Sequence, residues 1–182
     1  MNFQGDGFFY RGDLKAAKGR YEQALQVAAR TTDRRLILIS KFNLAKAAVK
    51  EGRSRAAVSD LRRLAGQADA LGLKYASVEC SVFVGEALVN AKDYAQARQE
   101  LDRALARSEK LGLEALQAKS QYLLATALRL TGNGAEAARH YADAHRILDE
   151  MSSEAKSDTL LKRADLAPIY AESAKWSRSA AL

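Results

Sequence analysis

The sequence has very little of what breaks, cross-links or anchors a protein chain. It holds one proline, one cysteine and 11 glycines in 182 residues, and its longest strongly apolar run, Leu36 to Ile39, is far too short to cross a bilayer. A single cysteine excludes an internal disulfide and favours a reducing compartment, here the cytoplasm. The N-terminus lacks the basic flank and apolar run of a signal peptide, so we expect neither a membrane span nor a targeting segment.

Helix-forming residues make up most of what is present. The chain is 48% hydrophobic and 28% charged, as in an ordinary folded domain. Ala, Leu, Arg, Lys, Gln and Glu fill nearly every window, and these residues are strong helix formers. The composition therefore predicts an all-α fold.

The chain aligns with itself at one fixed offset in sequence, equal to the number of positions that separate Gly12 from Gly52. Turn-like triplets recur in step, each between two segments with helical apolar spacing, and they begin at Gly12, Gly52, Lys92 and Gly132. Glycine suits a tight turn between helices. A second series, Leu71-Gly72-Leu73 and Leu111-Gly112-Leu113, has the same spacing. The two series predict units of two long antiparallel helices.

Columns of similar residues accompany the turns at fixed distances and share one helix face. After the turns they are Ala17, Ala57, Ala97 and Ala137; Tyr21, Leu61, Leu101 and Tyr141; Ala24, Leu64, Ala104 and Ala144. Before the turns stand Gly5, Ala45, Gly85 and Ala125. We expect the small residues to let paired helices approach closely.

Together these spacings resemble the tetratricopeptide repeat consensus over roughly residues 3–151. The 40-residue period with Leu-Gly-Leu links is similar to the long-helix variant of bacterial regulators and signalling proteins. The resemblance implies a right-handed α-α superhelix, a solenoid of antiparallel helix pairs. We expect four units, at about 1–32, 33–72, 73–112 and 113–152.

Both ends depart from the period. The first helix of the first unit would begin before Met1, so we expect a truncated helix in a fragment of a longer protein. This helix would expose Phe3, Phe8, Phe9 and Tyr10. Residues 153–182 predict a cap with a helix from about Ser153 to Asp165, a second helix from Pro168 to Trp176, and fraying beyond Ser177.

No residues stand in a catalytic or metal-binding pattern. His140 and His145 are five positions apart on their predicted helix, so they point to different faces and cannot form the paired-ligand geometry of a helical metal site. Cys80 lacks a nearby base and is expected to be a buried, inert thiol. Asn133 and Glu136 fit a helix-capping pair rather than a phosphate loop. The sequence predicts no enzyme, metal or cofactor.

In the tetratricopeptide family, the first helix of each unit lines a concave face that binds partners. The resemblance carries this role to positions opposite the packing columns: Phe42, Lys46, Val49 and Lys50; Val82, Glu86, Val89 and Asn90; Tyr122, Thr126, Arg129 and Leu130. Packing between helices is the alternative for Val82 and Val89. A carboxylate clamp known in one subgroup is not expected, because Glu79 and Phe83 stand where it needs basic residues, although Asn43 matches.

Positive charge gathers in the second predicted repeat. Residues 33–72 carry +5 of the net +7. The predicted basic patch is Arg53, Arg55, Arg62 and Arg63. A solvated basic face explains this patch without any partner, and an acidic peptide or protein segment is the next explanation. Nucleic acid is disfavoured because aromatic residues do not interleave with the basic ones.

The leading hypothesis is a non-catalytic scaffold that binds a partner peptide or helix in its groove, as part of a larger bacterial regulatory or signalling protein. One alternative is a ligand-sensing or oligomerisation module of a transcription regulator. Another is a structural array that self-associates through its exposed N-terminal end.

Overall fold

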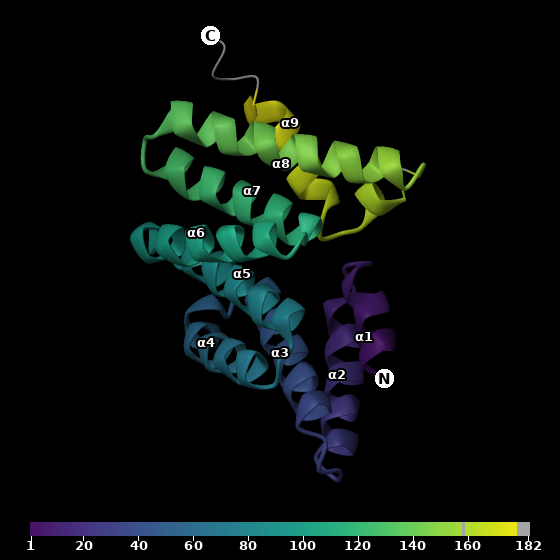
Figure 1. Cartoon of the computed structure of the whole chain (residues 1–182). Coiled ribbons are helices and arrows are strands. Elements are labelled where there is room, and N and C mark those ends of the chain that lie inside the picture. Colours follow the sequence, from purple (N-terminus) through teal and green to yellow (C-terminus); the bar gives the residue numbers. More distant parts are fainter. Residues whose placement is uncertain (158, 178–182) are drawn as a thin grey trace. The chain divides into compact units, whose positions relative to one another are not determined.

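The computed structural model describes residues 1–157 and 159–177, and within these ranges the chain forms helices and no strands (Figure 1). The predicted all-α fold is confirmed. The helices are α1 (Asn2–Phe9), α2 (Leu14–Ala28), α3 (Arg34–Lys50), α4 (Ser54–Ala70), α5 (Lys74–Asn90), α6 (Tyr94–Lys110), α7 (Glu114–Leu130), α8 (Gly134–Glu154) and α9 (Ala167–Ser177). A short 3-10 turn, Leu160–Lys162, precedes α9.

The chain divides into two compact units, each larger than one predicted repeat: the first unit is Met1–Ala91 and the second unit is Lys92–Leu182. In the first unit each of the helices α1 to α4 packs on the helix that follows it, and α3 also contacts α1 and α5. In the second unit α6 packs on α7, α7 on α8, and α8 on α9 (Figure 1). The division falls between α5 and α6, and therefore within the range 73–112 that the repeat pattern treats as one unit.

The interhelical turns lie at the predicted positions. The backbone angle φ is +82° at Gly12, +86° at Gly52 and +86° at Gly132, a left-handed conformation that glycine adopts without strain. Lys92 stands at the corresponding position of the remaining turn. Its φ of +63° is unfavourable for a residue with a side chain. The backbone of the turn thus repeats even where the glycine does not.

The three packing columns that follow the turns form much of the core of both units. Every residue in them is at most 7% exposed. The glycine in the preceding column is required at Gly5, because a Cβ atom there would lie 2.4 Å from Cε1 of Tyr21. Close approach of α1 to α2 at this glycine is confirmed.

The N-terminal aromatic side chains are only partly exposed. Phe3 is 88% exposed, as expected, but Phe9 is 3% exposed. The expectation for Phe9 is wrong because α1 packs against both α2 and α3, which buries one of its faces.

The predicted helix from Ser153 to Asp165 is also wrong. Helix α8 continues to Glu154, and the chain then turns at Lys156, where φ is +49°. This turn lets Leu166 and Ile169 return to the apolar cluster that includes Leu148. The second predicted helix is present as α9, and the predicted fraying beyond Ser177 lies outside the described residues.

The predicted capping pair at the start of α8 does not form. Asn133 is the N-cap residue, but its side-chain amide donates to Oγ1 of Thr131 at 3.2 Å. Glu136 instead forms an ion pair with Arg98 of α6, at 3.6 Å. Competition from these two partners explains why the local sequence pattern is misleading here.

Candidate functional site

Lys46 lies at the centre of a buried polar and aromatic cluster in the first unit. Its side chain is 2% exposed, and its Nζ lies 3.5 Å from Oδ1 of Asp6 and 4.0 Å from Oε1 of Glu79. The same Nζ is 4.6 Å from the ring centroid of Phe9 and 5.5 Å from that of Phe42. Carboxylates and aromatic faces together offset the cost of removing the ammonium from water.

This cluster corrects the expectation that Phe42, Lys46 and Val49 line an open groove, because none of the three is more than 2% exposed. Helix α1 covers this face of α3. Asp6 of α1 joins this helix to α3 through the ion pair with Lys46, and it also accepts a hydrogen bond from the Tyr21 hydroxyl of α2 at 2.8 Å. Burial and the neighbouring Asp6 raise the pKa of Tyr21, so its phenol remains a hydrogen-bond donor.

On α5 the structure separates the apolar from the polar candidates. Val82 is 1% exposed, so the packing alternative holds for it. Glu86 accepts a hydrogen bond from Lys50 Nζ at 2.5 Å, and Asn90 donates one to Ser54 Oγ at 3.2 Å. Lys50, Glu86 and Asn90 are therefore the predicted groove residues of the first unit that retain access to solvent.

On α7, the candidates Tyr122, Thr126 and Arg129 are half-buried, and α9 contacts Tyr122 and Arg129. The Tyr122 hydroxyl donates to Oε2 of Glu172 at 2.7 Å. The Arg129 guanidinium lies 4.5 Å from the ring centroid of Trp176. Burial, followed by the hydrogen bond and charge of Glu172, raises the pKa of Tyr122. In the second unit helix α9 of the chain itself thus lies against the face predicted for a partner.

A buried ion cluster fixes the segment that leads into α9. Lys119 Nζ lies 2.5 Å from Asp165 Oδ2, and the Arg163 guanidinium donates to both oxygens of the same carboxylate at 3.0 Å. Burial alone would raise the pKa of Asp165, but Lys119 and Arg163 outweigh it and hold this pKa below its usual range.

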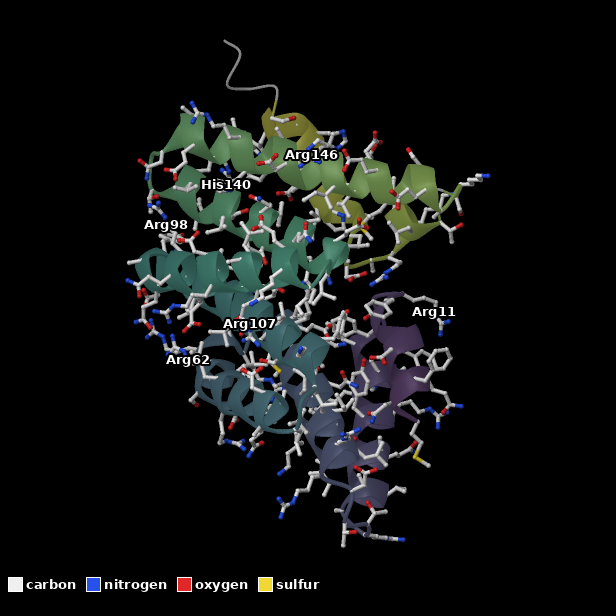
Figure 2. The ribbon with its side chains drawn as sticks, in the orientation of Figure 1. Arg11, Arg62, Arg98, Arg107, His140 and Arg146 are labelled. Atoms are coloured by element: carbon white, nitrogen blue, oxygen red, sulfur yellow. The ribbon has the colours of Figure 1, made fainter. Side chains whose placement is uncertain are left out.

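The predicted basic patch is on the surface. All four arginines, Arg53, Arg55, Arg62 and Arg63, are exposed, and Figure 2 shows the side chain of Arg62 extending from α4. They do not form one site. Arg53 pairs with Glu51 and Arg63 pairs with Asp60 at 3.0 Å. Arg53 and Arg63, but not Arg55 or Arg62, also line a groove that the sequence analysis missed.

This groove lies on the first unit along α3, where one hollow is lined by residues of α2, α3 and α4 and a second hollow by residues of α3 and the end of α4. Among the described residues, no α-carbon of α2 comes within 8 Å of one in α4, so α3 is left uncovered between them. Two hollows of about 530 Å³ and 350 Å³ follow α3 and share Lys41. Their apolar floor includes Ile37, Leu44, Ala45, Ala48, Leu64 and Leu71. We call this surface the α3 groove.

Two signals for the α3 groove were present in the sequence. Ala45 and Ala48 are small residues at positions that face neighbouring helices, and small side chains leave space when no helix fills it. The excess of positive charge in residues 33–72 was the second signal. The family resemblance directed attention to the opposite face of the first helices instead.

The side chains considered for chemistry are structural. Cys80 is completely buried, as predicted, and burial raises the pKa of its thiol, so it is a poor nucleophile. His140 bonds to Gln121, and His145 packs against the ring of Tyr170 with centroids 4.4 Å apart. Across residues 1–157 and 159–177, His, Cys, Asp and Glu side chains do not gather in threes as a metal site would require. In the same part of the chain, no helix is both long and apolar enough to span a membrane.

Comparison with known proteins gives a likeness in structure only. No protein-family model and no curated protein matches the chain. A crystal structure of a Rap protein complexed with Competence and Sporulation Factor is similar over 99% of this chain, with 16% sequence identity and a TM-score of 0.75. The apo form of RapI is similar over 99% of this chain, with 18% identity and a TM-score of 0.67.

The chain spans 52% of the length of the first of these proteins and 68% of the second. At such low identity the likeness shows the fold alone. It supports an all-helical, tetratricopeptide-like repeat fold.

Proposed function

We propose that the chain is a non-catalytic protein-interaction module that binds a peptide or helical segment of a partner. The fold supports this proposal, since the Rap structure with the same fold was solved in complex with Competence and Sporulation Factor. The turns that recur at a fixed period with positive φ support placing the chain among the long-period tetratricopeptide variants of bacterial regulators. Repeat folds of this kind present long surfaces that suit extended or helical ligands.

One observation favours a particular surface, the α3 groove, as the place where the partner binds. The chain's own end helices lie against the predicted binding faces, with α1 over Lys46 and α9 against Tyr122. The α3 groove has an apolar floor with space above it. An open apolar groove is the feature with which a folded module binds a partner helix. Lys50, Glu86 and Asn90 supply a second, polar contact surface on the same unit.

A display selection with the intact chain as bait tests the proposal. A library of random peptides of about 15–20 residues is long enough to follow the groove as a helix. We expect an enriched sequence pattern and a dissociation constant in the micromolar range, about −8 kcal/mol of binding free energy. The enriched peptides should raise the melting temperature of the chain, and at equal concentration a peptide that binds more tightly should raise it further.

Two outcomes contradict this function. If repeated selections enrich no peptide over scrambled peptides of equal composition, the chain does not recognise peptide segments. If the purified chain instead forms a stable dimer that a Phe3→Ser variant abolishes, self-association through the exposed N-terminal helix replaces the proposal.

A further inference from the structure

We propose that the α3 groove binds an acidic amphipathic helix of a partner protein. This inference rests on the proposed function and adds the surface and the chemistry of the partner.

The floor of the groove has the shape that a helix requires. Ile37, Lys41, Leu44 and Ala48 are spaced three or four residues apart and so form one stripe along α3. The stripe from Ile37 to Ala48 extends for about 17 Å, the length of about three turns of a partner helix. Leu44, Ala45 and Ala48 are half-buried, so the apolar side chains of a ligand would reach them directly.

The rim of the groove is positively charged. Five basic residues line it, namely Lys18, Arg34, Lys41, Arg53 and Arg63, against two acidic ones, Glu22 and Asp60.

Most of these charges are already paired within the chain. Glu22 pairs with Lys18 at 3.9 Å, and Asp60 with Arg63 at 3.0 Å. Arg34 and Lys41 form no ion pair with any residue that the structure describes. The two cations beside the floor thus remain available for carboxylates of a partner.

The second unit provides an internal comparison, because α6, α7 and α8 stand two repeat periods after α2, α3 and α4. There, the corresponding surface is bridged. Arg98 of α6 lies 3.6 Å from Glu136 of α8. In the first unit Lys18 and Ala56 stand at these two positions, so the bridge cannot form.

A second contact bridges the corresponding surface of the second unit. Gln121 of α7 bonds to His140 of α8, and Figure 2 shows His140 on that helix. Their counterparts in the first unit are Lys41 and Asp60. Asp60 accepts a hydrogen bond from Arg63 instead.

The charge is also reversed between the two units. Arg34 corresponds to Glu114, and Arg63 corresponds to Asp143. The shared backbone therefore does not by itself produce an open, basic groove. The side chains of the first unit produce it, as expected of a site for an acidic ligand.

The groove fits a helix better than a nucleic acid. None of the described residues that line its two hollows is aromatic, so bases would have nothing on which to stack. Phosphates would use the cations and leave the apolar floor in contact with water. An amphipathic helix with acidic flanks covers the floor and neutralises the rim together.

The test uses the intact chain and the peptide display selection, with two variants as additional baits. The groove variant carries Arg34→Glu and Lys41→Glu. The control variant carries Arg55→Glu, which changes an exposed arginine of α4 that lies outside the groove. Circular dichroism melting verifies that both variants fold. Individual peptides are then measured by fluorescence anisotropy at two salt concentrations.

We expect the selected peptides to carry Asp or Glu beside apolar residues spaced three or four apart. The groove variant should bind them at least about tenfold more weakly, whereas the control variant should change affinity by less than about twofold. A third variant, Ala48→Leu, fills the floor with the residue that Leu128 places at the corresponding position of α7. It should weaken binding with no loss of melting temperature.

Three results of the peptide measurements would overturn the inference while leaving the proposed function in place. The enriched peptides could be neutral or basic. They could bind the groove variant and the wild-type chain equally well. They could also lose affinity equally with Arg55→Glu, which would indicate general electrostatic attraction. A single-stranded oligonucleotide that binds through Lys41 more tightly than any acidic peptide would also overturn it. If no peptide is enriched at all, the proposed function fails.

Discussion

Tyr141 offers the sharpest test of how α9 is held against α7 and α8. Its side chain is 1% exposed, and its ring stacks on that of Trp176 with centroids 6.5 Å apart. Its hydroxyl accepts a hydrogen bond from Arg129 Nε at 3.2 Å and lies 3.2 Å from Thr126 Oγ1. Leucine occupies the corresponding positions 61 and 101, so the Tyr141→Leu variant should preserve the packing of the core.

The expected loss has two parts that two variants separate. Tyr141→Phe removes only the hydroxyl and should cost about 1–2 kcal/mol of unfolding free energy, because one of the two groups it contacts is charged. Tyr141→Leu also removes the aromatic contacts with Trp176 and Tyr122, which adds about 1–2 kcal/mol. Tyr141→Leu should therefore lose about 2–4 kcal/mol, and Tyr141→Phe about half of that.

Fluorescence reports the position of α9 directly, because Trp176 is the sole tryptophan in the chain. In Tyr141→Leu we expect the emission maximum to move to longer wavelength and acrylamide to quench the signal more strongly. In Tyr141→Phe both should match the wild type. If Tyr141→Leu leaves emission and quenching unchanged, Tyr141 does not anchor α9.

Three further predictions concern stability, each measured by urea or acid unfolding followed by circular dichroism. Gly5→Ala should cost about 1–3 kcal/mol, because the added Cβ collides with the ring of Tyr21, and an unchanged urea midpoint would contradict that close packing. Lys92→Gly should add about 0.5–1 kcal/mol by relieving positive φ, whereas a lower midpoint would show that the lysine side chain stabilises the turn. Asp165 has a depressed pKa when folded, so its ion pairs with Lys119 and Arg163 stabilise the chain above the unfolded pKa of about 3.9, and this contribution is lost as the pH falls through the folded value. Asp165→Asn should therefore be less stable at pH 7 and lose less stability than the wild type between pH 5 and pH 2, and equal losses would contradict the coupling.

The helices and their turns were predictable because they depend on local sequence. A turn needs positive φ at one residue, and a column of alanine, leucine or tyrosine on one face determines which side of a helix is buried. The period identified the turn position even at Lys92, where the residue itself gives no sign of a left-handed conformation. Repetition supplied information that no single turn contained.

The faces of the first helices were not predictable in the same way. A helical pattern separates the core face from the rest, but it does not show which neighbour covers the remainder. Lys46 has the residue type of an exposed binding residue and is buried because Asp6 and Phe9 come from α1, a helix that lies well before it in the sequence. The role of α9 at Tyr122 was hidden for a related reason, since residues after Glu154 do not follow the repeat.

The contrast between the two units explains why the fold alone does not determine which partner the chain binds. Each unit places three helices in the same order, two repeat periods apart, yet Arg34 and Lys41 stand in one where Glu114 and Gln121 stand in the other. One surface is open and basic, and the other is bridged and carries acidic residues. Since this change occurs between units of a single chain, likeness at 16% identity to a Rap protein cannot transfer a ligand. We expect recognition to depend on the few side chains that line the α3 groove, and variants at those positions test whether this surface binds the partner.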